Sequence, residues 1–290
     1  MKTFNEYCKE RFGEKLYKNS LNAGFTCPNR DGTKGTGGCI FCSEGGSGEF
    51  AASSLMPIDE QIEEAKKKVA GKYKGDKYIA YFQAFTNTYA AVDELEKLYM
   101  PVINRDDIAA ISIATRADCL GDDVIGLIDR LNRIKPLIVE IGLQSSKKET
   151  IRYIRRGYDN EEYVRVIKNL NSIGVHTVTH VILGLPGETK EDMQETVRFA
   201  AEAGTKGIKL QLLHVLKGTD LAKEYEEGKF KVMSLDEYID VLNACVSVLP
   251  RKMVIHRLTG DGPKKLLIAP KWSGDKKKVL NRINKYVNFS

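Results

Sequence analysis

Residues 27–42 read C-P-N-R-D-G-T-K-G-T-G-G-C-I-F-C, and the interpretation of the whole chain starts from this stretch. Its three cysteines, Cys27, Cys39 and Cys42, are separated by eleven and then two residues. Four glycines and one proline lie between the first two cysteines. Such a density of glycine is costly inside a helix or strand, so the stretch is predicted to be a loop that directs three thiols toward a common ligand.

Apolar segments alternate with amphipathic segments along most of the chain. Strands are predicted before the cysteine loop at 21–26 and then at 78–85, 108–115, 137–143, 175–183 and 208–216. Helices are predicted at 58–74, 93–100, 122–133, 147–156, 161–173 and 190–203, the second of them ended by Pro101. Apolar strands that alternate with helices indicate a parallel sheet covered by helices.

Six strand–helix units are too few for a closed barrel of eight, so an open partial barrel and a doubly wound sheet both fit. In either fold the functional residues belong at the carboxyl ends of the strands. Polar residues do follow the predicted strands, and these are Gln83, Thr86, Asn87, Thr88, Thr115, Arg116, Gln144 and His214.

The last part of the chain is predicted to be a small α/β extension. A helix is expected at 234–248, a short strand at 253–256 and a final helix at 275–287. Residues 251–290 carry eleven Lys and Arg against two Asp, whereas the whole chain has a net charge of +6. We expect a core over 1–217 and a basic extension over 218–290, which either binds an anionic partner such as nucleic acid or is a solvated helix face.

Composition limits the class of protein. The chain has 290 residues, of which 42% are hydrophobic and 29% charged, so it can form a large core. No apolar run approaches the roughly 18 residues of a membrane span, and residues 1–10 lack a signal core. Six cysteines without a signal favour a reducing, cytoplasmic location, in which thiols are free or bind metal.

The spacing of the three thiols favours an iron–sulfur cluster over other thiol chemistry. A structural zinc site needs four ligands, and the histidine nearest to the loop is His176. A redox C-x-x-C pair needs no third thiol, and a disulfide would leave one thiol over. Thiolates are the standard ligands of iron–sulfur clusters, and three of them leave one iron of a four-iron cluster open for a substrate or cofactor.

The loop resembles the radical S-adenosylmethionine superfamily, in a long-gap subfamily related to the catalytic subunit of Elongator. Further stretches carry this resemblance along nearly the whole chain. They are Y-F-Q-A-F-T-N-T-Y (81–89), T-R-A-D-C-L (115–120), V-E-I-G-L-Q-S (139–145), R-R-G-Y (155–158), L-G-L-P-G-E-T (183–189) and H-R-L-T-G-D-G-P (256–263). The resemblance implies a partial (β/α)6 TIM-type barrel that binds a [4Fe-4S] cluster and S-adenosylmethionine.

The resemblance also implies roles for single residues. Cys27, Cys39 and Cys42 would ligate the cluster. Five residues would contact S-adenosylmethionine, namely Phe41 and Leu185 at the adenine, Gln83 at the amino group, Gln144 at the ribose and Arg156 at the carboxylate. The alternatives for Phe41 and Arg156 are loop packing and a surface helix arginine.

Several other residues keep two interpretations. Arg116 and Asp118 would bind cofactor or substrate at the mouth of the barrel. Cys119 either gives a hydrogen atom to a substrate radical or, as is more usual for a free cysteine, packs as a small apolar residue. His180 and His214 are expected to be core histidines with hydrogen-bond partners, and Cys8 and Cys245 are given no function.

The reaction implied by the resemblance is reductive cleavage of S-adenosylmethionine to a 5′-deoxyadenosyl radical. The implied substrate is the wobble uridine of tRNA, at the step from a carboxymethylaminomethyl to an aminomethyl side chain. Transfer RNA would bind the basic C-terminal segment, and flavodoxin or ferredoxin would supply the electron. Two alternatives stay open, a radical enzyme acting on a small molecule or peptide and a non-catalytic metal-binding or RNA-binding module.

Overall fold

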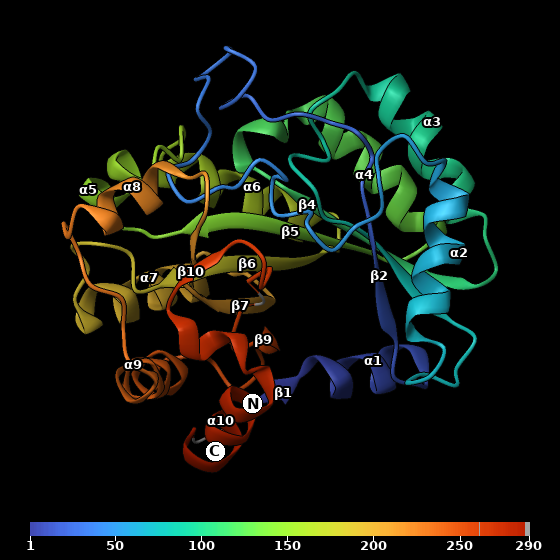
Figure 1. Ribbon diagram of the computed structural model, residues 1–290. Coiled ribbons are helices and arrows are strands. Elements are labelled where there is room, and N and C mark those ends of the chain that lie inside the picture. Colours follow the sequence, from blue (N-terminus) through green and yellow to red (C-terminus); the bar gives the residue numbers. More distant parts are fainter. Residues whose placement is uncertain (261, 288–290) are drawn as a thin grey trace.

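A parallel sheet of eight strands forms the centre of the molecule (Figure 1). The computed structural model describes residues 1–260 and 262–287, so Asp261 of the 256–263 motif lies outside the described residues. In spatial order the strands are β1 (Lys2–Thr3), β9 (Val254–Arg257), β7 (Gly207–Leu212), β6 (His176–Leu183), β5 (Leu137–Gln144), β4 (Ile108–Thr115), β3 (Tyr78–Phe82) and β2 (Tyr17–Leu21).

The order of the strands shows that this is an open barrel. Strands β2 to β7 lie side by side in chain order, and all neighbouring pairs are parallel. A doubly wound sheet would reverse its strand order at a switch point, and β2 to β7 show no such reversal. Strands β1 and β2 form the two edges of the sheet in the described part of the chain. The partial α/β barrel predicted from the sequence is therefore confirmed.

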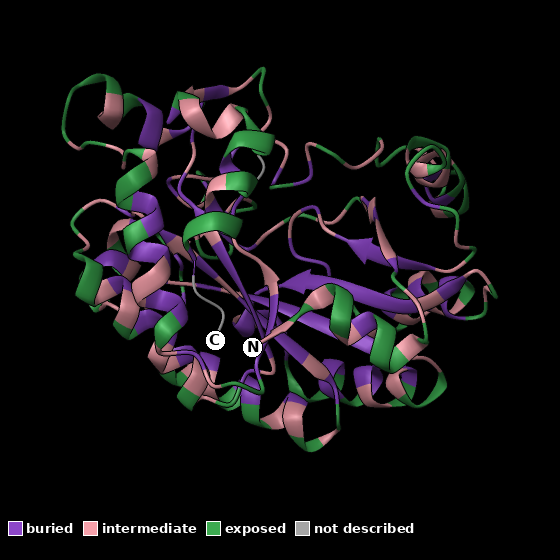
Figure 2. Ribbon diagram, turned by 90° about the horizontal axis from the view of Figure 1, so that it is seen from below, coloured by how far each residue is buried: buried purple, intermediate pink, exposed green. Residues whose placement is uncertain are grey.

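The helices are α1 (Phe4–Phe12), α2 (Ile58–Val69), α3 (Val92–Ile103), α4 (Asp122–Ile134), α5 (Lys148–Tyr153), α6 (Asn160–Ser172), α7 (Lys190–Glu202), α8 (Asp220–Glu226), α9 (Leu235–Ser247) and α10 (Lys276–Tyr286). Helices α2, α3, α4, α6 and α7 pack on strands of the sheet, whereas α10 packs on α9. Figure 2 shows central strands that are mostly buried and helices whose outer faces are exposed. No helix among the described residues is both long enough and apolar enough to cross a membrane.

Helix α4 shows why these segments fold as helices on a sheet. It buries Val124, Leu127, Ile128 and Leu131, which recur at helical spacing on one face. Burying one such aliphatic side chain contributes about 1.5–3 kcal/mol. The charged residues between them remain on the solvent side, so the amphipathic pattern determines which face packs on the sheet.

Helix α2 ends at Val69 and not at Lys74, β3 ends at Phe82 and not at Phe85, and four further segments differ from the sequence-based predictions. Strand β2 ends at Leu21, where a strand was expected to begin, because the Asn22 side chain accepts a hydrogen bond from the Gly24 amide and turns the chain. Helix α3 continues through Pro101, because burial of Val102 and Ile103 outweighs one lost hydrogen bond. The other two differences concern 208–216 and 147–156.

The segment predicted as one strand at 208–216 forms two. Strand β7 ends at Leu212, and β8 (Val215–Leu216) pairs antiparallel with β10 (Leu267–Ala269) in a separate small sheet. The C-terminal part also adds β9 to the main sheet, beside β7. The segment at 147–156 is helical only over α5, because Arg155 and Gly157 have left-handed backbone conformations.

The N-terminal helix α1, which the sequence analysis did not predict, lies at the amino end of the sheet (Figure 1). Thr3 caps it, and the Glu6 carboxylate accepts a hydrogen bond from the Thr3 amide in return. Phe4 packs on His256 with ring centroids 4.3 Å apart, and Tyr7 packs on His176 at 4.4 Å. This packing covers the amino end of the barrel, whereas the cysteine loop lies at the carboxyl ends.

Candidate active site

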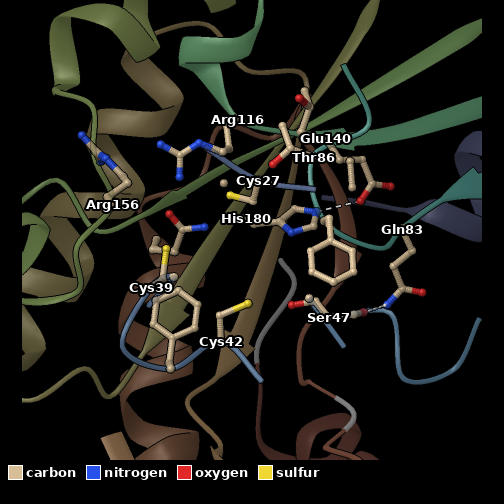
Figure 3. Close-up of a pocket in the computed structure, with 18 of the residues that line it drawn as sticks. Cys27, Cys39, Cys42, Ser47, Gln83, Thr86, Arg116, Glu140, Arg156 and His180 are labelled. Atoms are coloured by element: carbon tan, nitrogen blue, oxygen red, sulfur yellow. Dashed lines mark hydrogen bonds and ion pairs between the residues drawn. The ribbon is translucent and has the colours of Figure 1, made fainter. Parts of the chain in front are cut away.

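One cavity of about 180 Å³ brings the three thiols together with residues from the carboxyl ends of the strands. Cys27, Cys39 and Cys42 all line it, and their sulfur atoms face a common space (Figure 3). The other side chains used below that line it are Phe41, Tyr81, Gln83, Arg116, Glu140, Gln144, Arg156, Tyr158, His180, Lys209, Gln211 and Arg257.

The first half of the cysteine loop is held by two buried or half-buried side chains, Asn29 and Arg30. The Asn29 amide donates to the Arg155 carbonyl at 2.6 Å and lies 3.5 Å from the Cys39 sulfur. Arg30 donates to the carbonyl of Cys42 at 3.0 Å. A Cβ atom at Gly38 would lie 3.0 Å from the Arg30 side chain, so glycine lets the loop close around this arginine.

The segment 46–48, which follows the cysteine loop, packs closely on the end of β3. Added Cβ atoms at Gly46 and Gly48 would each approach side chains of Phe85 or Ala84 to 2.4 Å. Gln83, which was predicted to contact S-adenosylmethionine, donates to the Ser47 carbonyl at 2.7 Å. The Gln83 carbonyl oxygen is therefore the part of this amide that can accept a hydrogen bond from a ligand.

The chemistry of the three thiols fits a cluster better than a single metal ion. Among the described residues, no group of three His, Cys, Asp or Glu side chains is placed so that it could hold a metal ion. In a [4Fe-4S] cluster each thiolate binds a different iron atom, so the sulfurs surround a space and need not converge on one point. The arrangement of Cys27, Cys39 and Cys42 around the cavity suits this requirement.

The environment of Cys39 and Cys42 favours the protonated thiols. Cys39 is open to the cavity but otherwise surrounded by protein, and burial raises its pKa to about 12, with Cys42 adding to the shift. Burial also raises the pKa of Cys42, while Arg30 opposes this shift. Cluster binding therefore has to displace protons from these thiols.

A buried carboxylate, Glu140, lies at the inner wall of the same cavity (Figure 3). One oxygen accepts from Lys18 and from the Ser112 hydroxyl at 2.7 Å. The other accepts from Lys209 and from His180 Nε2 at 2.7 Å. Burial by itself raises the pKa of Glu140, but Lys18, Lys209 and the hydrogen bond from His180 together hold it well below its usual value.

His180 has the hydrogen-bond partners expected for a core histidine. Because a carboxylate only accepts, Nε2 of His180 carries the proton that it donates to Glu140, and Nδ1 accepts from Gln211 at 3.2 Å. Burial lowers the pKa of His180 to about 4, and Lys209 adds to this effect. His180 is therefore neutral at pH 7.

Arg156 is not a surface helix arginine, because it is 1% exposed and lies beyond the end of α5. Its guanidinium donates to the carbonyls of Tyr158, Leu143 and Ser145 and to the Asn160 side chain, at 2.9–3.0 Å. Four of its five N–H groups are used in this way, so a two-pronged contact to a carboxylate would break existing hydrogen bonds. Its predicted contact with S-adenosylmethionine stays a prediction.

The remaining predicted residues divide into two groups. Phe41, Gln83 and Gln144 line the cavity, and Gln144 has a positive φ of 59°, which directs the chain sharply at the end of β5. Leu185 and Cys119 are not among the residues that line it. Leu185 is buried in an apolar cluster with Ile40, and the pKa of Cys119 is raised to about 12 by burial.

Arg116 and Asp118 form a buried pair near the first cysteine. Arg116 lines the cavity and donates two parallel hydrogen bonds to Asp118 at 2.9 and 2.8 Å. Lys34, from the cysteine loop, pairs with the same carboxylate at 2.7 Å. The pair therefore connects the loop to the end of β4, and Arg116 places a fixed positive charge beside the thiols.

The sequence analysis gave no role to the charged residues of the inner wall. A signal was present, because Glu140 and Lys209 each interrupt an otherwise apolar strand segment, L-I-V-E-I-G-L and I-K-L-Q-L. A charge inside a buried strand is costly unless it is paired or faces a polar site. Only the spatial order of β5, β6 and β7 shows which charges meet.

Comparison with known protein families supports this interpretation of the site. A family model described as the Radical SAM superfamily matches residues 27–200, and so begins at the first cysteine of the loop. A second, described as the Radical_SAM C-terminal domain, matches residues 205–288.

Bacterial relatives are similar over almost the whole chain. YtqA of Bacillus subtilis (strain 168) is 44% identical over 283 residues, which cover 98% of this chain and 88% of YtqA. YhcC of Escherichia coli (strain K12) is 32% identical over 279 residues, which cover 96% and 89%.

Archaeal proteins show a more distant similarity. The tRNA uridine(34) acetyltransferase of Methanocaldococcus jannaschii is 23% identical over 182 residues, which cover 62% of this chain and 33% of that protein. The structure of Methanocaldococcus infernus Elp3 has the same fold, with a TM-score of 0.69 at 17% identity. That match covers 93% of this chain but only 63% of the Elp3 chain.

Proposed function

The chain belongs to the radical S-adenosylmethionine superfamily, and on this basis we propose that it modifies the side chain of the wobble uridine in tRNA. The enzyme class implies a [4Fe-4S] cluster and S-adenosylmethionine as cofactors. When bound and reduced, the cluster supplies the electron that cleaves S-adenosylmethionine to the 5′-deoxyadenosyl radical. The observation that carries the proposed radical chemistry is the cavity lined by three thiols from one loop.

The residues of the chain bind and orient these cofactors. Cys27, Cys39 and Cys42 would hold the cluster, and Asn29 and Arg30 hold the loop that carries them. Phe41, Gln83 and Gln144 would bind S-adenosylmethionine from the cavity wall. Closure of the amino end of the barrel by α1 leaves the carboxyl ends as the side from which substrate enters.

Two observations support tRNA as the substrate. The most informative named relative acts on tRNA uridine(34), although the similarity covers only a third of that protein. Helix α10 packs on α9 through Val279 and Ile283 and carries Lys277, Lys278 and Lys285 on its exposed side. A basic surface of this kind suits a phosphate backbone. The step we propose converts a carboxymethylaminomethyl into an aminomethyl side chain.

Anaerobic reconstitution with iron and sulfide tests the enzyme class. The wild-type protein should become brown and, with a reductant, form 5′-deoxyadenosine from S-adenosylmethionine. Cys42→Ala should lose the colour and the product, because two thiolates do not complete the site. Cys245→Ala is the matched control, since Cys245 is buried in α9 and does not line the cavity. A colourless protein that leaves S-adenosylmethionine intact would contradict the proposal.

The nucleoside composition of tRNA in a deletion strain tests the substrate. Loss of the enzyme should increase the carboxymethylaminomethyl form of the wobble uridine and decrease the aminomethyl form. Re-expression of the wild-type gene should restore both, whereas the Cys42→Ala gene should not. Unchanged wobble nucleosides would refute the tRNA assignment and leave the enzyme class intact.

The electron must come from a one-electron carrier, for which we propose flavodoxin or ferredoxin. A surface groove of about 1010 Å³ lies beside the cysteine loop. Its charged lining consists of four basic and two acidic residues, namely Lys34, Lys148, Arg152, Arg155, Asp159 and Glu161, so basic residues are in excess. Asn29 lines the same groove and lies against the Cys39 sulfur. An acidic carrier protein docked there would be close to the cluster.

A further inference from the structure

The buried ion cluster on the inner wall contains more positive than negative charge. Lys18 and Lys209 both pair with Glu140, which is the only carboxylate that either lysine contacts within the described residues. Four donors, from Lys18, Ser112, Lys209 and His180, occupy the acceptor positions of Glu140. Glu140 is therefore fully used, and the two lysines share one negative charge.

Lys209 is the member of this cluster that can meet a ligand. It lines the cavity that holds the three thiols, whereas Lys18 does not. Within the described part of the chain, its ammonium reaches Glu140 and the Tyr81 hydroxyl at 3.3 Å. An ammonium has three N–H groups, so one remains available to an acceptor in the cavity.

This arrangement disfavours the charged form of Lys209. Burial lowers the pKa of Lys209 to about 7, against the opposing effect of Glu140, and Lys18 and Arg257 lower it further. A buried positive charge without a full counter-charge is unfavourable. A bound anion would remove the imbalance.

We propose that the inner wall of the cavity, at Lys209, is a binding site for the carboxylate of the substrate. Lys18, Lys209 and Glu140 together leave one positive charge uncompensated, which a carboxylate can neutralise. The other polar groups that line this part of the cavity are those of Arg257, Gln211 and Tyr81, and all of them have N–H or O–H groups that a carboxylate can accept.

The carboxylate site would make the enzyme selective for its substrate over its product. This inference rests on the proposed function. A carboxymethylaminomethyl side chain ends in a carboxylate, whereas the aminomethyl product does not. The carboxylate would enter the barrel first and be held by β7, while the rest of the nucleoside would remain nearer to the loop of the thiols. A second cavity of about 260 Å³ is lined by Phe41 of that loop and by Gly260, Gly262 and Pro263. It shares Gln83, Gln211 and Arg257 with the first cavity, so it gives the nucleoside a route of entry.

Binding to the reconstituted holoenzyme tests the site. The probes are 5-carboxymethylaminomethyluridine and its neutral carboxamide, titrated in the presence of S-adenosylmethionine. Wild-type protein should bind the carboxylate about 10- to 100-fold more tightly than the amide, as expected for a hydrogen bond between charged groups. Lys209→Met should reduce this preference to about 1.

The matched control is Lys206→Met. Lys206 lies just before β7, at the opposite end of the strand from the thiols, and donates to the Val175 carbonyl at 2.6 Å. Lys206 does not line the cavity, so this variant should keep the wild-type preference. A preference retained in Lys209→Met, or absent in the wild type, would overturn the proposal.

A measurement on the wild-type protein alone tests the site without depending on the folding of a variant. Binding of the carboxylate at pH 8 should raise the pKa of Lys209, so that the protein takes up a proton together with the ligand. Binding of the amide should take up no proton. Calorimetry in two buffers of different ionisation enthalpy measures this uptake. No difference between the two ligands would count against the site.

Two further outcomes separate this site from the function on which it rests. If Lys209→Met weakens S-adenosylmethionine binding and leaves the nucleoside preference intact, the site binds the cofactor carboxylate and the proposal is wrong. If the wild type forms no 5′-deoxyadenosine but still prefers the carboxylate, the proposed function fails while the binding site stands.

Discussion

Arg156 holds together three chain segments at the cofactor side of the cavity. It donates to carbonyls at the end of β5 and just beyond α5, and to the side chain of Asn160 at the start of α6. The Tyr158 ring packs on its guanidinium, with 4.4 Å from the carbon to the ring centroid. Its position suggests that it shapes the binding wall and does not primarily contact a ligand.

Arg156→Met should therefore lower the free energy of unfolding by about 3 kcal/mol, because it leaves several buried acceptors without donors. Urea unfolding of the apoprotein measures this loss. Arg133→Met, at an exposed helix position, should change stability by less than about 0.5 kcal/mol. If Arg156→Met weakens S-adenosylmethionine binding with no loss of stability, the direct carboxylate contact predicted from the sequence would be supported instead.

Glu140 compensates the buried Lys209 and the half-buried Lys18, so its loss should be more damaging than the loss of either lysine. Glu140→Gln should destabilise the protein by about 3–5 kcal/mol, because Lys18 and Lys209 would then face each other without a counter-charge. Adding Lys18→Met to Glu140→Gln should recover part of this loss. Equal stability of the single and double variants, measured by urea unfolding, would show that the lysines do not depend on Glu140.

At the scale of elements, β6, β9 and α1 bury two neutral histidines at the amino end of the barrel. His176 and His256 lie with their Nε2 atoms 3.0 Å apart, under Phe4 and Tyr7 of α1. Burial lowers the pKa of His176 to about 3, with Lys206 and Lys18 adding to the shift. Burial, Lys18 and His176 also hold the pKa of His256 well below its usual value.

These lowered pKa values predict loss of stability in mild acid. The unfolded chain takes up protons on both histidines below pH 6.5, whereas the folded chain does not, so their contribution is complete above pH 6.5 and decreases below it. Each histidine should add about 1.4 kcal/mol per pH unit to the slope between pH 6 and 5. His256→Phe should reduce that slope by one such increment, and an unchanged slope would contradict this account.

The cysteine loop and α5 form the groove proposed for the electron carrier, and charge reversal there has a specific expected effect. Lys148→Glu together with Arg152→Glu should slow reduction of the cluster by flavodoxin about tenfold or more. Reduction by dithionite, which is small, should keep its wild-type rate and serves as the internal control. Equal slowing with both reductants would indicate damage to the cluster, and no slowing would place the docking surface elsewhere.

At the scale of the whole molecule, the basic charge is concentrated on the C-terminal part, away from the cysteine loop in sequence. Replacing Lys277, Lys278 and Lys285 by Ala should weaken tRNA binding and reduce the dependence of log affinity on log salt by up to about 2–3. The matched control replaces Lys67, Lys68 and Lys72 of the exposed α2 region. Both sets of replacements would be compared in tRNA titrations between 50 and 200 mM salt. Equal weakening of tRNA binding by the two sets would show that α10 is not the tRNA-binding surface.

The sequence alone indicated the class of fold and the candidate ligands of the cluster. Apolar strands alternating with amphipathic helices require a covered parallel sheet, and this expectation is local in origin, because each segment has its own period and buried face. The three thiols of the loop were identifiable because their spacing lies within 16 consecutive residues. The positions of Gln83, Arg116 and Gln144 at strand ends followed from the same pattern.

Only the tertiary structure determines which charged residues meet at the inner wall and which helix closes the amino end of the barrel. Lys18, Glu140 and Lys209 come from β2, β5 and β7, and no local pattern couples them. The same is true of β1 and β9, whose places beside β7 depend on contacts between the two ends of the chain. Long-range packing of this kind depends on the relative position of all strands at once, whereas the loop of thiols depends only on its own residues.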